Sequence, residues 1–210
     1  MFNFFHKKAN CNPTLPTQAY IFIGRSGCGK GTQADLLIAH LKENDCEHET
    51  LHLETGKLLR AYKEGKTYSA QKCNEIYAVG GLMPEFLVVN MWSEFVMKNL
   101  TNEKNIVFDG CPRKVHEAQV LDSAFDFYNI KKINVFFMNV SREWSEARML
   151  ARKRADDNVT DIKARLDWYD TDVKPTVEWY RSNPRYNFLD INGEQSIELV
   201  KKEILAKLGV

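Results

Sequence analysis

The chain has 210 residues, of which 44% are apolar and 27% are charged, and its formal net charge is +1 at pH 7. This is the composition of an ordinary globular protein, large enough for one sizeable domain. A charge so near zero gives no global field to attract nucleic acid or an anionic membrane. The longest apolar run, about residues 133–140, is far shorter than the roughly 20 residues of a membrane-spanning helix. We therefore expect neither nucleic acid nor a membrane as a partner.

The five cysteines stand singly along the chain. No CxxC pair occurs, so the sequence predicts no structural zinc, and an odd number of cysteines argues against a disulfide framework. A reducing cytoplasm is the simplest location that fits this pattern.

The first 17 residues lack the continuous apolar stretch of a secretory signal and are predicted to form a flexible tail. They contain no acidic residue, which leaves a transit peptide as the alternative. Residues 18–210 are expected to form a single domain.

Short apolar runs alternate with longer helical patterns along the rest of the chain. Strands are predicted at 19–24, 47–53, 105–110, 133–140 and 186–191, and helices at 31–44, 114–128, 141–154, 160–173 and 196–209. Residues 55–84 have a helical pattern without a strand, and Pro175 is expected to end or kink a helix. The alternation predicts an α/β fold, a five-stranded parallel sheet with helices on both faces.

A phosphate-binding loop is predicted where the first strand meets the first helix. The spacing Gly24-x-x-x-x-Gly29-Lys30 lets main-chain N–H groups turn inward around phosphate oxygens, while the lysine reaches the β and γ phosphates. The alternative is a glycine-rich turn of a Rossmann-like fold. Most such loops place Ser or Thr after the lysine, whereas this chain has Gly31 followed by Thr32. The predicted ATP-binding loop comprises Gly24, Arg25, Ser26, Gly27, Cys28, Gly29, Lys30, Gly31 and Thr32.

Five motifs follow one another in order: "GKGTQ", "HLETGKLLR", "GGLMPEFLV", "FDGCPRKVHEAQ" and "RMLARKRADDNVTDIKARL". Together they resemble the short-lid members of the adenylate kinase family of nucleoside monophosphate kinases. The resemblance implies a P-loop core, a helical monophosphate-binding insertion at about 55–85 and a minimal lid at about 152–160. It further implies a monomer that transfers a phosphoryl group reversibly from ATP to AMP, with Mg²⁺ as cofactor.

Phosphoryl transfer needs a dense group of cations, because charge spreads over the oxygens of the transferring group. By the resemblance, the catalytic residues are Lys30, Asp109, Arg113, Arg148, Arg154 and Arg165. Arg148, Arg152 and Gln195 join the loop in binding ATP. The AMP-binding residues are Thr55, Gly56, Arg60, Leu82, Met83, Gly110, Arg113, Glu117, Arg154 and Arg165.

Asp109 is predicted to end a strand beside the loop, where a carboxylate would hold Mg²⁺ through water. Its alternative is a turn or helix-capping residue. Asp156 and Asp157 are either lid-edge acids or caps of the next helix.

Two positions depart from the family pattern. Glu117 stands where the family usually has a glutamine that reads adenine, and an ionised carboxylate can only accept hydrogen bonds, which suits guanine better. Lys57 stands where an aspartate is common, and it either meets phosphate or points to solvent. Two alternatives therefore stay open: a kinase for GMP, UMP or CMP, or a nucleotide sensor with little turnover.

Overall fold

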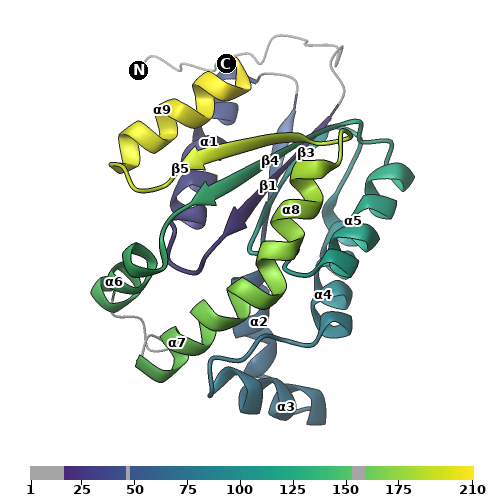
Figure 1. Ribbon diagram of the computed structural model, residues 1–210. Helices are drawn as coiled ribbons and strands as arrows, with labels where there is room; N and C mark the ends of the chain where they lie inside the picture. The colour runs from purple at the N-terminus through teal and green to yellow at the C-terminus, as the bar shows by residue number, and fades with distance from the viewer. Residues whose placement is uncertain (1–16, 46–47, 153–158) are drawn as a thin grey trace, which may run out of the picture.

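The computed structural model describes residues 17–45, 48–152 and 159–210. Its five strands form one parallel sheet in the order β2-β3-β1-β4-β5 (Figure 1). The strands are β1 (Gln18–Gly24), β2 (Glu49–Glu54), β3 (Lys104–Asp109), β4 (Lys132–Asn139) and β5 (Asn187–Asn192). The predicted fold class is confirmed.

Helices cover both faces of this sheet. One face packs against α1 (Lys30–Asn44) and α9 (Ile197–Leu208). The other packs against α4 (Glu85–Asn99), α5 (Val115–Phe127) and α8 (Lys174–Ser182). Consecutive residues of β1, such as Ile21 and Phe22, are therefore both buried, in different clusters. This two-sided burial explains why the central strands β1, β3 and β4 appear in the sequence as continuous apolar runs.

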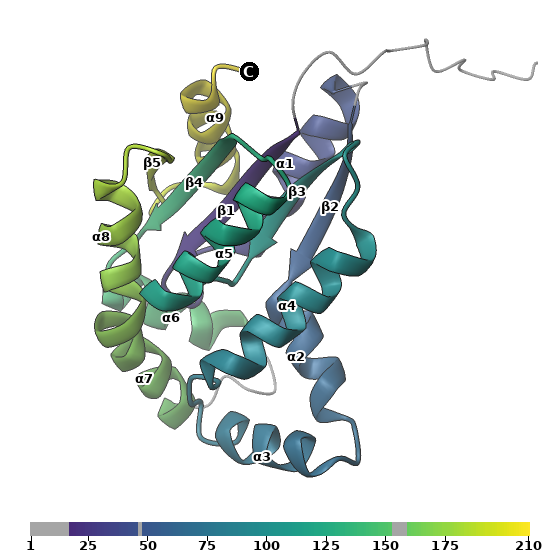
Figure 2. The same ribbon diagram turned by 90° about the vertical axis from the view of Figure 1, so that its right-hand side faces the viewer.

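Four further helical segments lie near the end of the sheet where the strands finish. Two of them, α2 (Thr55–Lys63) and α3 (Tyr68–Tyr77), follow β2, and Figure 2 shows α3 as the helix farthest from the sheet. The others are α6 (Arg142–Arg152) and α7 (Val159–Trp168), which pack together through Met149, Ile162 and Leu166. No helix in the described part of the chain is both long and apolar enough to cross a bilayer.

The helix predicted at 160–173 is divided. It is α-helical to Trp168 and continues as a π-helical turn, Tyr169–Val173, before α8 begins. Pro175 lies in the first turn of α8, directly after the π-helical turn. The chain thus stays helical through Pro175, with a π-helical turn directly before it, so the helix does not end at the proline.

One helix, α4, has no counterpart in the sequence prediction. Residues 85–99 are rich in β-branched and aromatic side chains, which weakens a helical reading. In the structure Leu87, Val88, Met91, Trp92 and Val96 form a buried stripe against the sheet. Tertiary packing, rather than intrinsic helix propensity, therefore stabilises α4.

Candidate active site

The carboxyl ends of all five strands meet at one edge of the sheet, and the segments that follow them surround a common space. The loop after β1 leads into α1, β2 leads into α2, and Asp109 ends β3. The register pairs Glu54 with Asp109, so Thr55 and Gly110 are neighbours at this edge. A Cβ atom on Gly110 would lie 3.9 Å from the Cβ of Thr55.

The loop from Gly24 to Lys30 has the tight conformation that its glycines predict. Gly27 and Gly29 have φ angles of 82° and 94°, in the left-handed region that favours glycine. A Cβ on Gly27 would lie 2.8 Å from Met149 Cγ, so α6 packs directly against the loop. Ser145 of α6 also donates a hydrogen bond to the carbonyl of Ser26. The loop thus ends at the N-terminus of α1, the arrangement that favours a bound phosphate.

The ammonium group of Lys30 lies across this loop. Its Nζ donates to the carbonyl oxygens of Gly24 at 3.0 Å and Arg25 at 2.8 Å. These bonds hold a positive charge over the loop, so phosphate oxygens would meet both the charge and the main-chain N–H groups.

Asp109 lies beside the first turn of α1. A Cβ on Gly31 would stand 3.1 Å from Asp109 Oδ2, so the glycine after Lys30 leaves room for the carboxylate. Burial raises the pKa of Asp109, against the lowering effect of Lys30, His52 and Arg113.

The donor set at Asp109 fits Mg²⁺. This ion prefers oxygen ligands and usually binds proteins through one or two carboxylates together with substrate phosphates and water. The described residues contain no group of three or more His, Cys, Asp and Glu side chains arranged to hold a metal. The single carboxylate of Asp109, facing the phosphate loop, matches this mode of binding.

A narrow cavity opens between α2, α4 and the segment that enters α5. Its free volume is about 10 Å³, roughly that of one water molecule. Most of its wall is apolar, with charged groups at Glu85, Arg113, Lys114 and Glu117. The lining residues are Thr55, Leu59, Leu82, Met83, Glu85, Val88, Arg113, Lys114 and Glu117.

Arg113 is held in place from several sides. Its Nε donates to the carbonyl of Gly110 at 2.9 Å, and its guanidinium carbon lies 5.1 Å from the ring centre of Trp168. The hydroxyl of Thr176, in α8, donates to the Arg113 carbonyl at 3.1 Å. Burial lowers the pKa of Arg113, and the nearby positive charge of Arg165 adds to this effect. Arg165 of α7 therefore lies near enough to Arg113 for its charge to act on this guanidinium.

Glu117 is almost fully buried, with 2% of its surface exposed. Its Oε2 accepts a hydrogen bond from the main-chain N–H of Arg113 at 2.7 Å. Its Oε1 has no hydrogen-bond partner among the described residues. Burial raises the pKa of Glu117, against the lowering effect of the Arg113 N–H group.

Two other predicted arginines, Arg60 and Arg148, are exposed. One of the guanidinium nitrogens of Arg60 lies 3.2 Å from where a Cβ of Gly56 would stand. Arg148 lies on α6, with its guanidinium 4.8 Å from the ring centre of Trp144, and Arg152 ends the same helix. Arg154, Asp156, Asp157, most of the predicted lid and nearly all of the predicted tail lie outside the described residues.

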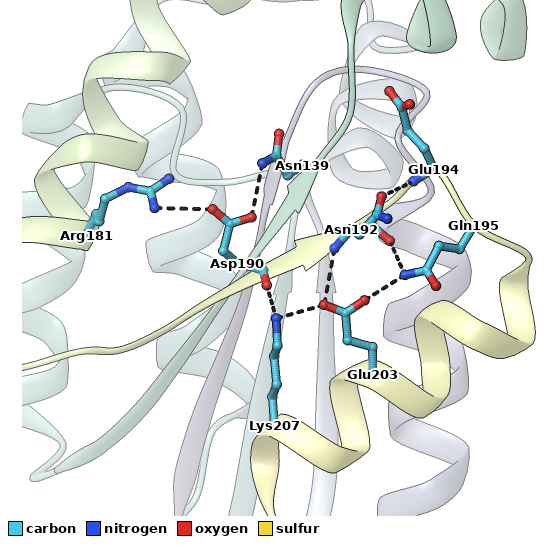
Figure 3. Close-up of polar contacts among 8 residues, drawn as sticks. All are labelled: Asn139, Arg181, Asp190, Asn192, Glu194, Gln195, Glu203 and Lys207. Atoms are coloured by element: carbon cyan, nitrogen blue, oxygen red, sulfur yellow. Dashed lines mark hydrogen bonds and ion pairs between the residues drawn. The ribbon is translucent and has the colours of Figure 1, made fainter.

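The loop after β5 is tied to the loop after β4. The N–H of Gly193 donates to the Asn139 carbonyl at 2.9 Å, and the N–H of Ser141 donates to Glu194 Oε1 at 2.6 Å. Figure 3 shows that the side chain of Gln195 donates to the Asn192 carbonyl and to Glu203, within this same loop and α9. The side-chain nitrogen of Gln195 and the main-chain N–H groups of Gly193 and Glu194 are thus all engaged within the protein.

Two contacts at the site were not foreseen. Arg25 forms an ion pair with Asp170 at 2.8 Å and lies over the ring of Tyr169, which joins the phosphate loop to the π-helical turn. The indole N–H of Trp168 donates to the carbonyl of Gly80 at 3.1 Å. Both partners are distant in sequence, so no local pattern could have revealed them. Lys57 is exposed and extends from α2 with Glu54 3.9 Å away.

A phosphate loop between β1 and α1, with a carboxylate at the end of the adjacent strand, defines a P-loop nucleotide-binding protein. The cavity at the same sheet edge has the cations Arg113 and Lys114 in its wall, which favour a second anionic group near the first. This combination is typical of a phosphotransferase.

Comparison with known proteins gives the family. A family model described as adenylate kinase matches residues 22–185. The chain belongs to the adenylate kinase family, whose members are nucleoside monophosphate kinases.

Individual relatives match over most of their length. The chain is 32% identical to an adenylate kinase of Prochlorococcus marinus (strain MIT 9515) and 33% identical to adenylate kinase 1 of Nostoc sp. (strain PCC 7120). Each match covers 90% of this chain and 97% of the relative. An adenylate kinase of Mycoplasma mycoides is 27% identical, over 88% of this chain and 98% of its own.

Proposed function

We propose that the protein catalyses the reversible, Mg²⁺-dependent transfer of the γ-phosphoryl group of ATP to AMP, giving two molecules of ADP. The proposal depends on one observation: two regions suited to bind anions lie side by side at the same edge of the sheet. These are the loop closed by Lys30 and the cavity bordered by Arg113.

In this proposal the loop from Gly24 to Thr32 binds the ATP phosphates. Lys30 exchanges its bonds with the Gly24 and Arg25 carbonyls for bonds with phosphate oxygens, at little cost in geometry. Asp109 orients the water shell of Mg²⁺, and the bound ion neutralises charge on the phosphates. Arg148, Arg152 and the main chain around Gly193 border the donor nucleotide.

The cavity takes the acceptor nucleotide. Arg113 and Arg165 hold its phosphate, with Arg60 and Arg154 completing the group, while Leu82 and Met83 enclose the base. Since the free volume is about 10 Å³, the base enters only when α2 and α3 move away from α4 and α5. The contact between Trp168 and Gly80 fits a role in reclosing this insertion and excluding water.

The proposal includes direct transfer within a monomer, in the reducing cytoplasm. The described cysteines, Cys28, Cys73 and Cys111, are buried free thiols, which fits a reducing location. The insertion at 55–85 and the lid at 152–160 belong to the same proposal. They are the parts expected to move between open and closed states.

A second candidate function is transfer to another monophosphate. The buried carboxyl of Glu117 favours it, because a carboxylate accepts hydrogen bonds from guanine and an amide is the better partner of adenine. GMP is thus the first alternative acceptor, ahead of CMP and UMP.

The test is an assay of ADP formation with MgATP, with and without each monophosphate. We expect ADP only when a monophosphate is present, with two ADP formed for each ATP consumed when it is AMP. Hydrolysis of ATP at an equal rate without a monophosphate would contradict the proposal. Binding of ATP with no ADP in any mixture would instead favour the sensor alternative.

A further inference from the structure

The carboxyl group of Glu117 is unusual because only one of its two oxygens is satisfied. The Arg113 N–H fixes Oε2, and this bond sets the orientation of the whole group. Oε1 has no accessible surface and no hydrogen-bond partner among the described residues, and Glu117 lines the cavity. A buried polar atom without a partner costs free energy, so a ligand that supplies the missing hydrogen bond gains affinity from it.

The wall around Glu117 is suited to a flat heterocycle. Leu59, Leu82, Met83 and Val88 supply apolar surface for the faces of a ring, so the polar contact falls on its edge. Because Oε2 is bonded to the main chain, Oε1 is the carboxyl oxygen of Glu117 that remains to form a hydrogen bond with this edge.

Whether Oε1 donates or accepts a hydrogen bond depends on whether the carboxyl group of Glu117 is protonated. A neutral carboxyl oriented with its O–H at Oε1 donates a hydrogen bond, which matches the N1 lone pair of adenine. An ionised carboxylate only accepts, which matches the N1–H and N2–H groups of guanine. The two purines therefore require opposite protonation states of the same group.

We propose that Glu117 selects the purine of the acceptor nucleotide, with AMP bound by the protonated carboxyl and GMP by the carboxylate. The proposal rests on the assignment of the cavity to the acceptor nucleotide. It adds that this chain accepts both purine monophosphates, in proportions set by pH.

The electrostatic surroundings of Glu117 act on its pKa in both directions. Burial raises the pKa of Glu117 and is the largest influence on it, and the charge of Glu85 on α4 acts in the same direction. The N–H groups of Arg113 and Lys114 and the Arg113 charge act in the opposite direction. His116 lies 2.5 Å from Glu85 and pairs with that carboxyl instead. The remaining titratable neighbours, Cys111 and Tyr180, are buried groups whose own pKa values burial raises, so they stay neutral.

The experiment compares AMP with GMP in the whole protein at a series of pH values between about 5.5 and 9, because burial raises the pKa of this carboxyl group. The ratio of kcat/KM for AMP to that for GMP cancels effects common to both, including titration of their identical phosphates. This ratio should fall at least tenfold as the pH rises. An unchanged ratio across the range would overturn the proposal.

The Glu117→Gln variant separates this role from a merely structural one. Its amide oxygen still accepts from the Arg113 N–H, and its NH₂ group then faces the base as a donor at every pH. We expect AMP turnover to persist, GMP turnover to fall about tenfold or more, and the ratio to become independent of pH. Glu94→Gln, an exposed change on α4, is the matched control and should behave as wild type.

A titration followed by NMR of ¹³C-labelled glutamate carboxyls gives a second readout. AMP should raise the pKa of Glu117 and GMP should lower it, because each ligand stabilises the form that it binds. Shifts in the same direction for both ligands would contradict the proposal.

The proposed role of Glu117 and the proposed function would be contradicted by different results. If the wild type forms ADP with AMP but Glu117→Gln has the same preference and pH profile, only the inference on Glu117 fails. If no monophosphate supports ADP formation, the proposed function fails. Equilibrium binding of AMP and GMP to the two proteins then still tests Glu117, and equal affinities would overturn it.

Discussion

In the loop between β1 and α1, a nucleotide would meet main-chain groups and one lysine from a short stretch of sequence. In the cavity between α2, α4 and α5, it would meet side chains brought together from separate parts of the chain. The protein itself satisfies the lysine of the loop, through the Gly24 and Arg25 carbonyls, whereas Glu117 Oε1 in the cavity has no described partner.

This difference implies that the loop serves the transfer reaction and that the cavity selects the acceptor base. A loop built from the main chain binds phosphate with little regard to the base, because every nucleotide carries the same phosphate oxygens. A cavity built from side chains distinguishes one base from another, because each polar atom in it accepts or rejects a particular hydrogen. We therefore expect changes in the loop to affect every substrate pair and changes in the cavity to alter which acceptor is used.

The largest effect is expected for Lys30→Ala. It removes the positive charge over the loop, so kcat should fall by about a thousandfold with every acceptor. The AMP to GMP ratio should not change. Steady-state assays with both acceptors measure this, and Lys42→Ala, an exposed lysine of the same helix, is the control. A Lys30 variant with near wild-type turnover would remove the loop from the mechanism.

Arg113→Ala should have the next largest effect and sharpen the contrast between the two regions. Loss of its guanidinium should lower turnover about a hundredfold and weaken AMP binding, because the acceptor phosphate loses a partly buried cation. ATP binding, measured separately by calorimetry, should stay within about twofold of wild type, because the loop is intact. Equal losses of ATP and AMP affinity would show that the two regions do not bind independently.

Asp109→Asn should lower activity and raise stability at the same time. Loss of the carboxylate should reduce kcat at least about tenfold and increase the Mg²⁺ concentration needed for half-maximal rate.

The stability effect of Asp109 has a definite direction. Because burial raises its pKa on folding, the stability that the protonated group contributes is present in acid and lost as pH rises through the folded pKa. The asparagine does not ionise, so the variant should have a higher Tm than the wild type at pH values above the pKa of Asp109 in the folded protein. In acid the two proteins should have the same Tm. Thermal unfolding of the nucleotide-free protein across pH checks this, and a lower Tm at neutral pH would contradict it.

The Glu117→Gln exchange described above is expected to change selection with little loss of AMP turnover, which makes it the counterpart of Lys30→Ala. The two variants together decide whether catalysis and base selection are separable.

The smallest effect is expected for Arg25→Ala. Its ion pair with Asp170 is partly exposed on the aspartate side, and Asp170 also pairs with Arg142, so the loss of stability should be below about 1 kcal/mol. The KM for ATP should rise about two- to threefold, because the loop is less firmly held against the π-helical turn. A double-mutant cycle with Asp170→Ala measures the pair itself, and additive effects would show that the contact does not position the loop.

The same contrast explains what could be predicted from the sequence. The loop follows a fixed local spacing, and the three central strands are apolar on both faces, so the P-loop and these strands were identified within a few residues. The edge strands β2 and β5 carry more polar residues and are weaker patterns. The family resemblance then located Asp109, Arg113 and Glu117 as candidates, because each lies in a recognisable motif.

Other features depend on contacts that local sequence does not encode. Helix α4, which supplies Glu85 and Val88 to the cavity, is stabilised by a buried stripe of bulky side chains with weak helix propensity. Glu117 was noted as a departure from the family pattern, but neither its bond to Arg113 nor the partnerless oxygen could be foreseen. The link between Arg25 and Asp170 joins residues far apart in the chain, and only the fold brings them together.

The most direct test of the two-site account is a crystal structure with a bisubstrate compound in which five phosphates link two adenosines. The account predicts phosphates in the Gly24–Lys30 loop and beside Arg113, with one adenine against Leu82, Met83 and Glu117. The other should lie near Gly193. Phosphates bound in the loop with the second adenosine outside the cavity would contradict the account, because the acceptor would then have no site beside the donor.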